Sequence, residues 1–262
     1  MDTNKIYVGD SAVVLKSFPS DSIDITVTSP PYDNLRKYNG YVFDFETIAQ
    51  ELYRVTKPGG VVVWVVGDAT INGSETGTSF KQALYFMQCG FRLHDTMIYQ
   101  TDKPPMNDRR YQSSFEYMFV FSKGKVSTFN PIMVPSSQAG KKRSSITYRE
   151  QDGSLKDQWR SGVYSATKIK PNVWYIQAGA SKGTLDKEAF AHPGTFPEKL
   201  ANDHIISWSN SGDIVLDPFA GSGTTLKMAK LSGRQYIGIE ISQEYADIAQ
   251  ARVDKAIIQE GL

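Results

Sequence analysis

The stretch that decides the fold is Val215-Leu216-Asp217-Pro218-Phe219-Ala220-Gly221-Ser222-Gly223-Thr224-Thr225. Its apolar start predicts the end of a buried strand, its glycines predict a turn, and a helix is expected to begin where the stretch ends. Because glycine has no Cβ, the backbone of such a turn can approach a bound cofactor closely, as it does in dinucleotide-binding folds. The stretch therefore predicts a cofactor loop between a strand and a helix.

A second apolar run, Gln235-Tyr236-Ile237-Gly238-Ile239-Glu240, follows this loop and ends in a carboxylate. Glu240 comes 17 residues after Gly223, and an acid at the end of the next strand can accept hydrogen bonds from ribose hydroxyls. Nicotinamide dinucleotides and S-adenosylmethionine both present a ribose to such an acid. Leu226 occupies the place of the third glycine of the dinucleotide fingerprint, and no Gly-Lys-Ser/Thr follows, so the sequence disfavours phosphate binding.

Similar apolar runs, rich in Val and Ile, recur along the chain and alternate with stretches that have helical spacing. This alternation predicts an α/β fold of the Rossmann-like kind, with a mostly parallel seven-stranded sheet, helices on both faces and a small insertion. A helix is expected over residues 45–55, ended by Lys57-Pro58-Gly59-Gly60. The seven expected strands are Lys5 to Val8, Ile23 to Val27, Val61 to Val66, Leu93 to Tyr99, Tyr117 to Phe121, Asp213 to Leu216 and Tyr236 to Ile239.

The insertion is expected from about Pro131 to Lys170, where the periodicity fades and no convincing buried strand appears. Between Lys141 and Lys170, eight basic residues stand against three acids, a net charge of +5, whereas the whole chain has +1. Any nucleic-acid-binding surface must therefore be a local one. We expect residues 1–130 and 176–262 to form two halves of one catalytic domain, with 131–175 as the insertion.

Composition excludes several classes of protein. The 262 residues are 40% hydrophobic and 22% charged, which is typical of a globular chain that buries one substantial core. No apolar run approaches the roughly 18 to 20 residues of a membrane span, and no basic segment leads into an apolar one at the start. We therefore expect a soluble, cytoplasmic protein without membrane contact.

The candidate active site is Thr28-Ser29-Pro30-Pro31-Tyr32, which directly follows the expected strand over residues 23–27. Open α/β sheets bind ligands in the crevice at the carboxyl ends of their strands. The two prolines remove N–H donors, so carbonyl oxygens and the Ser29 hydroxyl can converge on an incoming amino group. Tyr32 offers an aromatic face on which a base can stack. The alternative is a proline-rich turn that only caps the strand.

With both stretches in place, the sequence resembles the amino-methylating DNA methyltransferases, in the group whose catalytic motif precedes the cofactor motif. The resemblance spans nearly the whole chain and implies S-adenosylmethionine as cofactor. It assigns Ser29, Pro30, Pro31 and Tyr32 to catalysis. It assigns to the cofactor Asp10, Thr28, Phe196, Lys199, Asp217, Pro218, Phe219, Ala220, Gly221, Ser222, Gly223, Thr224, Thr225 and Glu240.

Two of these assignments have alternatives. His192-Pro193-Gly194-Thr195-Phe196-Pro197-Glu198-Lys199 is similar to the segment that closes over the methionine end of the cofactor, but it departs from the family's His-Pro-Thr-Gln-Lys-Pro at residues 194–196. It is also compatible with a helix that starts near Pro197. Asp10 is assigned to the adenine side of the pocket, and it could equally cap a helix over residues 11–17.

The resemblance implies methyl transfer to an exocyclic amino group of a flipped-out base. Ser29 at the first motif position favours N4 of cytosine, whereas family members with Asp there tend to act on N6 of adenine; because a hydroxyl both donates and accepts, adenine stays an alternative. The chemistry needs no metal. The sequence has no Pro-Cys dipeptide, which argues against carbon-5 methylation, a reaction that requires a thiolate. Protein-glutamine methyltransferases carry Asn first and the reverse motif order.

The family's target-recognition region coincides with the insertion. The basic run Lys141-Lys142-Arg143 would contact phosphates of double-stranded DNA, with Tyr148, Trp159 and Tyr164 available for stacking. A solvated loop is the competing interpretation of this segment, and a catalytically silent DNA-binding protein is the competing interpretation of the chain. The resemblance leaves open a cognate restriction endonuclease as partner and a homodimer.

Overall fold

The computed structural model describes residues 1–31, 43–101, 110–159, 161–177, 183–184, 186 and 197–257. The chain forms two compact units, one made of Met1–Asn130 and Asn172–Leu262 and the other of Pro131–Pro171. No helix within the described ranges is long and apolar enough to span a membrane.

The first unit is built on an eight-stranded sheet in the order β1-β14-β13-β2-β3-β7-β6-β12. Its neighbouring strands pair in parallel, except that β7 is antiparallel to both β3 and β6. The strands are β1 (Lys5–Val8), β2 (Ile23–Thr28), β3 (Thr56–Val66), β6 (Arg92–Gln100), β7 (Phe115–Ser122), β12 (Val173–Tyr175), β13 (Ile214–Asp217) and β14 (Gln235–Glu240).

The seven strands expected from the sequence are confirmed, but the number of strands in the sheet was wrong. The eighth strand, β12, pairs in parallel with β6 at the edge of the sheet. It has only three residues, Val173, Trp174 and Tyr175, of which the first and last are half exposed and Trp174 is buried. The run is apolar but short, and its pairing with β6 is what places it in the sheet.

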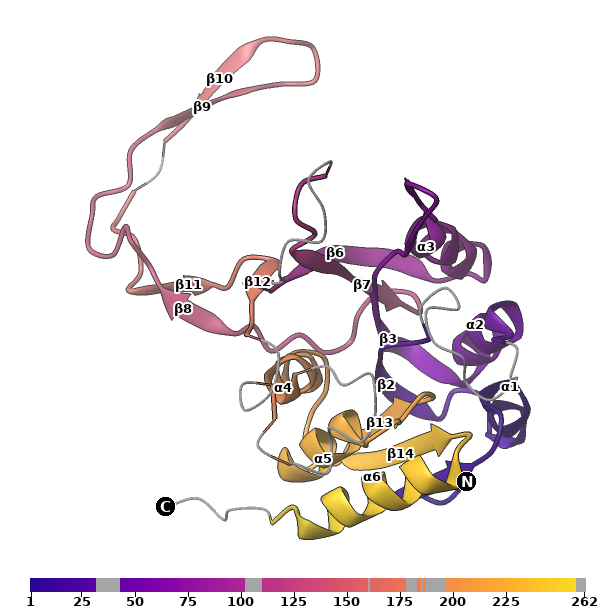
Figure 1. The fold of residues 1–262 in the computed structure, drawn as a ribbon. Coiled ribbons are helices and arrows are strands. Elements are labelled where there is room, and N and C mark those ends of the chain that lie inside the picture. Colours follow the sequence, from indigo (N-terminus) through magenta and orange to yellow (C-terminus); the bar gives the residue numbers. More distant parts are fainter. Residues whose placement is uncertain are drawn as a thin grey trace. The chain divides into compact units, whose positions relative to one another are not determined.

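Helices cover both faces of the sheet (Figure 1). On one face Trp64 of β3 shares a buried cluster with Leu52 of α2 and Phe86 of α3. On the other face α4 contacts β2 and β3, and α5 contacts β13 and β14. The helices are α1 (Ser11–Val14) with a 3-10 turn η1 (Leu15–Ser17), α2 (Phe45–Val55), α3 (Thr78–Gln88), α4 (Glu198–Trp208), α5 (Thr224–Leu231) and α6 (Gln243–Lys255).

Helix α2 and strand β3 illustrate how the sequence sets this core. Asp44 caps the start of α2 by accepting a hydrogen bond from the backbone N–H of Thr47, and the helix ends at Val55, as its spacing predicts. Residues 61–66 of β3 form a continuous apolar run, and all of them are buried because the strand lies inside the sheet with helices on both faces. Trp64 satisfies its indole N–H with the Gln82 side chain at 2.8 Å.

The strand order contains a switch point between β2 and β13. From β2 the chain continues to β3 on one side, whereas from β13 it continues to β14 on the other. Loops that leave two such strands diverge and open a crevice at their carboxyl ends, which is where open α/β sheets bind ligands. The candidate active-site motif follows β2, and the cofactor loop follows β13, so the topology brings the two motifs to one crevice.

The second unit consists of two antiparallel ribbons. Strand β8 (Met133–Pro135) pairs with β11 (Thr167–Ile169), and β9 (Ile146–Arg149) pairs with β10 (Leu155–Gln158). Most of their side chains are exposed, so the segment holds strands although it lacks the buried strand pattern. A further short ribbon, β4 (Thr70–Ile71) with β5 (Ser74–Glu75), belongs to the first unit.

Candidate active site

The end of β2 and the end of β13 are joined by a direct hydrogen bond. The Thr28 hydroxyl donates to the Asp217 carboxylate at 2.6 Å, and both residues are buried. Thr225 of α5 adds a second link, because its hydroxyl donates to the Val27 carbonyl at 3.1 Å. Ser29, the next residue after Thr28, is partly exposed at the same edge of the sheet. The two sequence motifs, nearly two hundred residues apart, thus form one site.

Asp217 is a buried acid whose charge is costly. Burial raises the pKa of Asp217 to about 6, although hydrogen bonds from the Thr28 hydroxyl and the Phe219 backbone act to lower it. The pKa of a buried carboxylate lies this close to neutral pH when the hydrogen-bond donors around it only partly replace water. Asp217 also holds the start of the loop, since the backbone N–H of Phe219 donates to it at 3.0 Å.

Glu240, at the carboxyl end of β14, reaches the middle of the glycine turn. Its Oε2 accepts a hydrogen bond from the Gly221 N–H at 2.8 Å, and its Oε1 accepts one from the Ser242 N–H at 3.0 Å. The carboxylate is almost completely buried, and this burial raises its pKa despite the two backbone donors. Two carboxylate oxygens offer about four acceptor sites, so Glu240 can still accept bonds from two ribose hydroxyls.

The cofactor loop needs its glycines for their backbone conformation. Gly221 and Gly223 have φ values of 51° and 79°, in the left-handed region that glycine adopts without strain. The turn closes with a 2.7 Å bond from the Gly223 N–H to the Ala220 carbonyl, and the Ala220 N–H bonds to Ile239 of β14. The backbone of the turn and the acid at the neighbouring strand end thus lie side by side at one polar edge of the sheet.

The first strand completes this edge. The Gly9 N–H donates to the Glu240 carbonyl at 2.9 Å, and the Ser11 hydroxyl donates to the Pro218 carbonyl. Asp10 accepts a hydrogen bond from the Ala12 N–H at 2.7 Å, so it caps α1 as one of its two interpretations expects. Capping uses one carboxylate oxygen of Asp10, and the neighbouring Gly9 is bonded to Glu240.

Some of the predicted site residues lie together at one edge of the sheet, and others do not. The structure brings Thr28, Ser29, the whole stretch from Asp217 to Thr225, and Glu240 to one edge of the sheet. Helix α4 starts at Glu198 after Pro197, as expected, and Lys199 forms an ion pair with Asp203 at 2.9 Å while its side chain stays mostly exposed. Tyr32 and Phe196 lie outside the described residues.

Sequence reasoning missed Arg252 of α6. Its guanidinium is almost fully buried and bonds to the carbonyl and the hydroxyl of Ser222 in the cofactor loop. The only sequence signal is position, because Arg252 follows the buried Ala246 and Ala249 at helical spacing and so lies on the apolar face of its helix. A charge there indicates a buried partner, which the sequence does not name.

The second unit carries the predicted DNA-contacting residues. Lys141, Lys142 and Arg143 are all exposed, and the Arg143 guanidinium lies over the Tyr164 ring at 5.4 Å from its centroid. Trp159, directly after β10, is 86% exposed.

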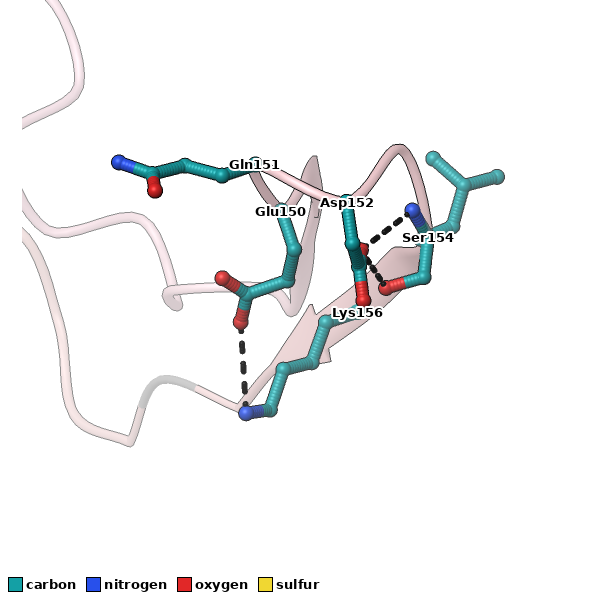
Figure 2. A pocket seen from close by; sticks show the side chains of 6 residues that line it. Glu150, Gln151, Asp152, Ser154 and Lys156 are labelled. Carbon is teal, nitrogen blue, oxygen red and sulfur yellow. Dashed lines mark hydrogen bonds and ion pairs between the residues drawn. The ribbon is translucent and has the colours of Figure 1, made fainter.

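The turn of the β9–β10 ribbon encloses an open hollow lined by acidic and polar side chains. Figure 2 shows Lys156 reaching back to Glu150, and Asp152 accepting bonds from the backbone and hydroxyl of Ser154. These groups satisfy one another inside the turn. The hollow lies in an exposed turn and belongs to a different unit from the cofactor loop.

Comparison with known proteins assigns the chain to a family. The DNA methylase family of N6 and N4 methyltransferases matches residues 23–251, most of the chain. The chain belongs to this family. It is therefore an S-adenosylmethionine-dependent DNA methyltransferase that acts on an exocyclic amino group.

Individual relatives are similar to this DNA methyltransferase over nearly its whole length. It is 58% identical to the orphan methyltransferase M.BamHII of Bacillus amyloliquefaciens, over 90% of this chain and 91% of the relative. It is 30% identical to the DNA adenine methyltransferase YhdJ of Escherichia coli (strain K12), over 97% of this chain and 84% of the relative. Among solved structures, a DNA modification methylase of Thermus thermophilus, complexed with S-adenosylmethionine, matches with a TM-score of 0.66 at 25% identity, over 98% of this chain and 95% of that one.

Proposed function

We propose that this DNA methyltransferase transfers the methyl group of S-adenosylmethionine to the exocyclic N4 amine of cytosine in double-stranded DNA. The observation that carries the proposal is the Thr28–Asp217 hydrogen bond, which holds the Ser29 motif and the cofactor loop at one switch point. A neutral Ser29, and not an aspartate, stands at the first position of the motif, which favours cytosine.

The residues of the Ser29 motif would hold the target amine after the base has left the duplex. The Ser29 hydroxyl and the Pro30 carbonyl accept bonds from the two N–H groups, which helps the nitrogen become pyramidal as it attacks. Tyr32 provides the stacking face for the base. S-adenosylmethionine supplies the electrophilic methyl group on its sulfonium. Pre-placed acceptors stabilise the positive charge that develops on the amine, and no covalent adduct with the base forms.

The proposed cofactor site comprises the Asp217 to Thr225 loop, Glu240, Asp10 and Thr28, with Phe196 and Lys199 from the closing segment. Glu240 binds the ribose hydroxyls, and the backbone of the glycine turn lies against the cofactor. Glu240→Ala should raise the Kd for S-adenosylmethionine roughly tenfold to a hundredfold, because it removes charged hydrogen-bond acceptors. Glu244→Ala, which removes an exposed acid in the first turn of α6, is the matched control and should leave the Kd unchanged.

The second unit is the proposed DNA-recognition region. Its exposed basic run, Lys141-Lys142-Arg143, contacts phosphates, while the exposed Trp159 and the ring of Tyr148 are available to stack on bases. The 58% identity to an orphan methyltransferase favours a chain that works without a paired restriction endonuclease.

Adenine N6 is the second candidate target. It is favoured by the relative YhdJ, an adenine methyltransferase, and by the ability of the Ser29 hydroxyl to donate as well as accept. In that case the fold, the cofactor site and direct attack by the amine stay the same, and only the acceptor base differs.

One experiment separates the candidates. The protein is incubated with DNA of diverse sequence and methyl-labelled S-adenosylmethionine, the DNA is digested to nucleosides, and mass spectrometry identifies the labelled base. N4-methylcytosine is expected; N6-methyladenine would overturn the inference from Ser29. Ser29→Ala should abolish labelling and leave the Kd for S-adenosylmethionine unchanged. An equal loss of cofactor affinity in Ser29→Ala would contradict the role given to this residue.

A further inference from the structure

A cluster of four charges lies behind the cofactor loop. Arg252 of α6 pairs with Asp186 and Glu198 at 3.0 Å each, and Lys227 of α5 pairs with the same two carboxylates at 2.8 Å each. The Arg252 side chain is 1% exposed and that of Lys227 is 13% exposed. The cluster connects two helices with the start of α4 and with Asp186.

Asp186 and Lys227 are each held in the charged form by the opposite charges beside them. Burial alone would raise the pKa of Asp186, but its hydrogen bonds and ion pairs with Lys227 and Arg252 hold the pKa below its ordinary value. Burial alone would lower the pKa of Lys227, and its bonds to Asp186 and Glu198 raise it instead. Two cations and two anions thus make a cluster of zero net charge, which avoids the large cost of an unpaired buried ion.

Of the two cationic side chains in the cluster, only that of Arg252 bonds to the cofactor loop. Its Nη1 donates to the Ser222 carbonyl at 2.5 Å and to the Ser222 hydroxyl at 3.1 Å, while Nε and Nη2 hold Asp186 and Glu198. The planar fork of a guanidinium presents five N–H donors in fixed directions, so it can hold all three groups at once. The side-chain ammonium of Lys227 donates its hydrogen bonds to the two carboxylates.

We propose that Arg252 is a positioning residue that fixes the Gly221-Ser222-Gly223 turn for cofactor binding. The inference rests on the proposed cofactor site. Two of the three residues are glycines with left-handed backbone, so the turn has little rigidity of its own. The charged bond to the Ser222 carbonyl orients the peptide group between them, while Glu240 holds the Gly221 N–H on the other side. Anchoring from both sides presents the turn in one conformation and removes the entropy cost of ordering it on binding.

The test compares Arg252→Met with Lys227→Met. Each variant removes one positive charge from the same cluster and leaves the cluster with a net charge of −1, so both should lower the thermal unfolding midpoint. The Kd for S-adenosylmethionine is measured by calorimetry well below both midpoints. Arg252→Met should raise this Kd roughly tenfold to a hundredfold, whereas Lys227→Met should change it less than about threefold. At saturating cofactor, kcat should be similar in the two variants.

A second variant covers the case in which Arg252→Met does not fold. Arg252→Lys keeps the cluster neutral, but an ammonium lacks the planar fork whose fixed donor directions serve Ser222 and both carboxylates, so the variant should fold and still bind the cofactor weakly. Equal Kd values in Arg252→Met and Lys227→Met, or a native Kd in Arg252→Lys, would overturn the proposal and leave the cluster a role in stability. Glu240→Ala tests the site independently: if it binds cofactor normally, the proposed cofactor site itself is wrong, and the role of Arg252 fails with it.

Discussion

Gly223 of the cofactor loop packs directly on Ala249 of α6. A Cβ added at Gly223 would stand 2.8 Å from the Ala249 Cβ, and the φ of 79° is one that residues with a side chain rarely adopt. The loop can therefore approach the C-terminal helix only because this position is a glycine.

Gly223→Ala should lower the free energy of unfolding and weaken binding of S-adenosylmethionine. Backbone strain of roughly 1 to 3 kcal/mol adds to the steric clash. The control is Gly212→Ala, at a φ of 86° with no atom within 4 Å of the added Cβ, so it carries the backbone strain without the clash. Urea unfolding and calorimetric binding measure both effects. Equal losses in the two variants would show that the contact with Ala249 is unimportant.

Removal of the Thr28 hydroxyl should destabilise the protein. Thr28→Val keeps the side-chain shape but deprives the buried Asp217 of a donor, which should cost roughly 1.5 to 3 kcal/mol at pH 8, where the acid is ionised. The control is Thr26→Val on the same strand, because the buried Thr26 hydroxyl has no hydrogen-bond partner among the described residues. Thr26→Val should be neutral or stabilising in urea unfolding. If Thr28→Val lowers the free energy of unfolding no more than Thr26→Val does, the Thr28–Asp217 hydrogen bond is unimportant for stability.

Asp217 should make stability depend on pH. Its pKa is about 6 in the folded protein against an ordinary 3.8, so the folded state binds this proton more tightly than the unfolded chain does. The contribution of Asp217 to stability is therefore greatest below pH 3.8, is lost as the pH rises through about 6, and is constant above. The loss amounts to about 3 kcal/mol.

Asp217→Asn removes this titration, so it isolates the effect of Asp217 from those of other acids. Urea unfolding at several pH values between about 4.5 and 7.5 should show the variant gaining stability relative to the native protein as the pH rises, by about 2 kcal/mol over this range. A stability difference that stays constant over this range would mean that Asp217 has an ordinary pKa.

The basic run of the second unit should set the salt dependence of DNA binding. Each phosphate contact contributes a slope of roughly 0.9 in a plot of log Kd against log salt concentration, so replacing Lys141, Lys142 and Arg143 by Ala should reduce the slope by up to about 3. The control replaces three exposed lysines of the first unit, Lys5, Lys16 and Lys81, which removes the same charge. Fluorescence anisotropy with a DNA duplex measures both; equal slopes in the two triple variants would place the phosphate contacts elsewhere.

The sequence by itself determined the parts of this protein that depend on local pattern. Recurring apolar runs predicted seven strands, and glycine spacing predicted the turn after β13. The helix over residues 45–55, with its end before Lys57, followed from apolar spacing and the stop signal after it. The resemblance to the family's motifs predicted Ser29, Asp217 and Glu240 as site residues.

Tertiary structure alone decided which distant residues meet. Strand β12 pairs with the edge of β6, and its three apolar residues are too few to place it in the sheet from the sequence. The Thr28–Asp217 bond depends on the order of strands at the switch point, and the bond from Arg252 to Ser222 depends on how α6 packs behind the loop. A hydrogen bond or a buried ion pair needs atoms within a few ångströms, and residues far apart in sequence reach such distances only after the sheet and its helices have packed.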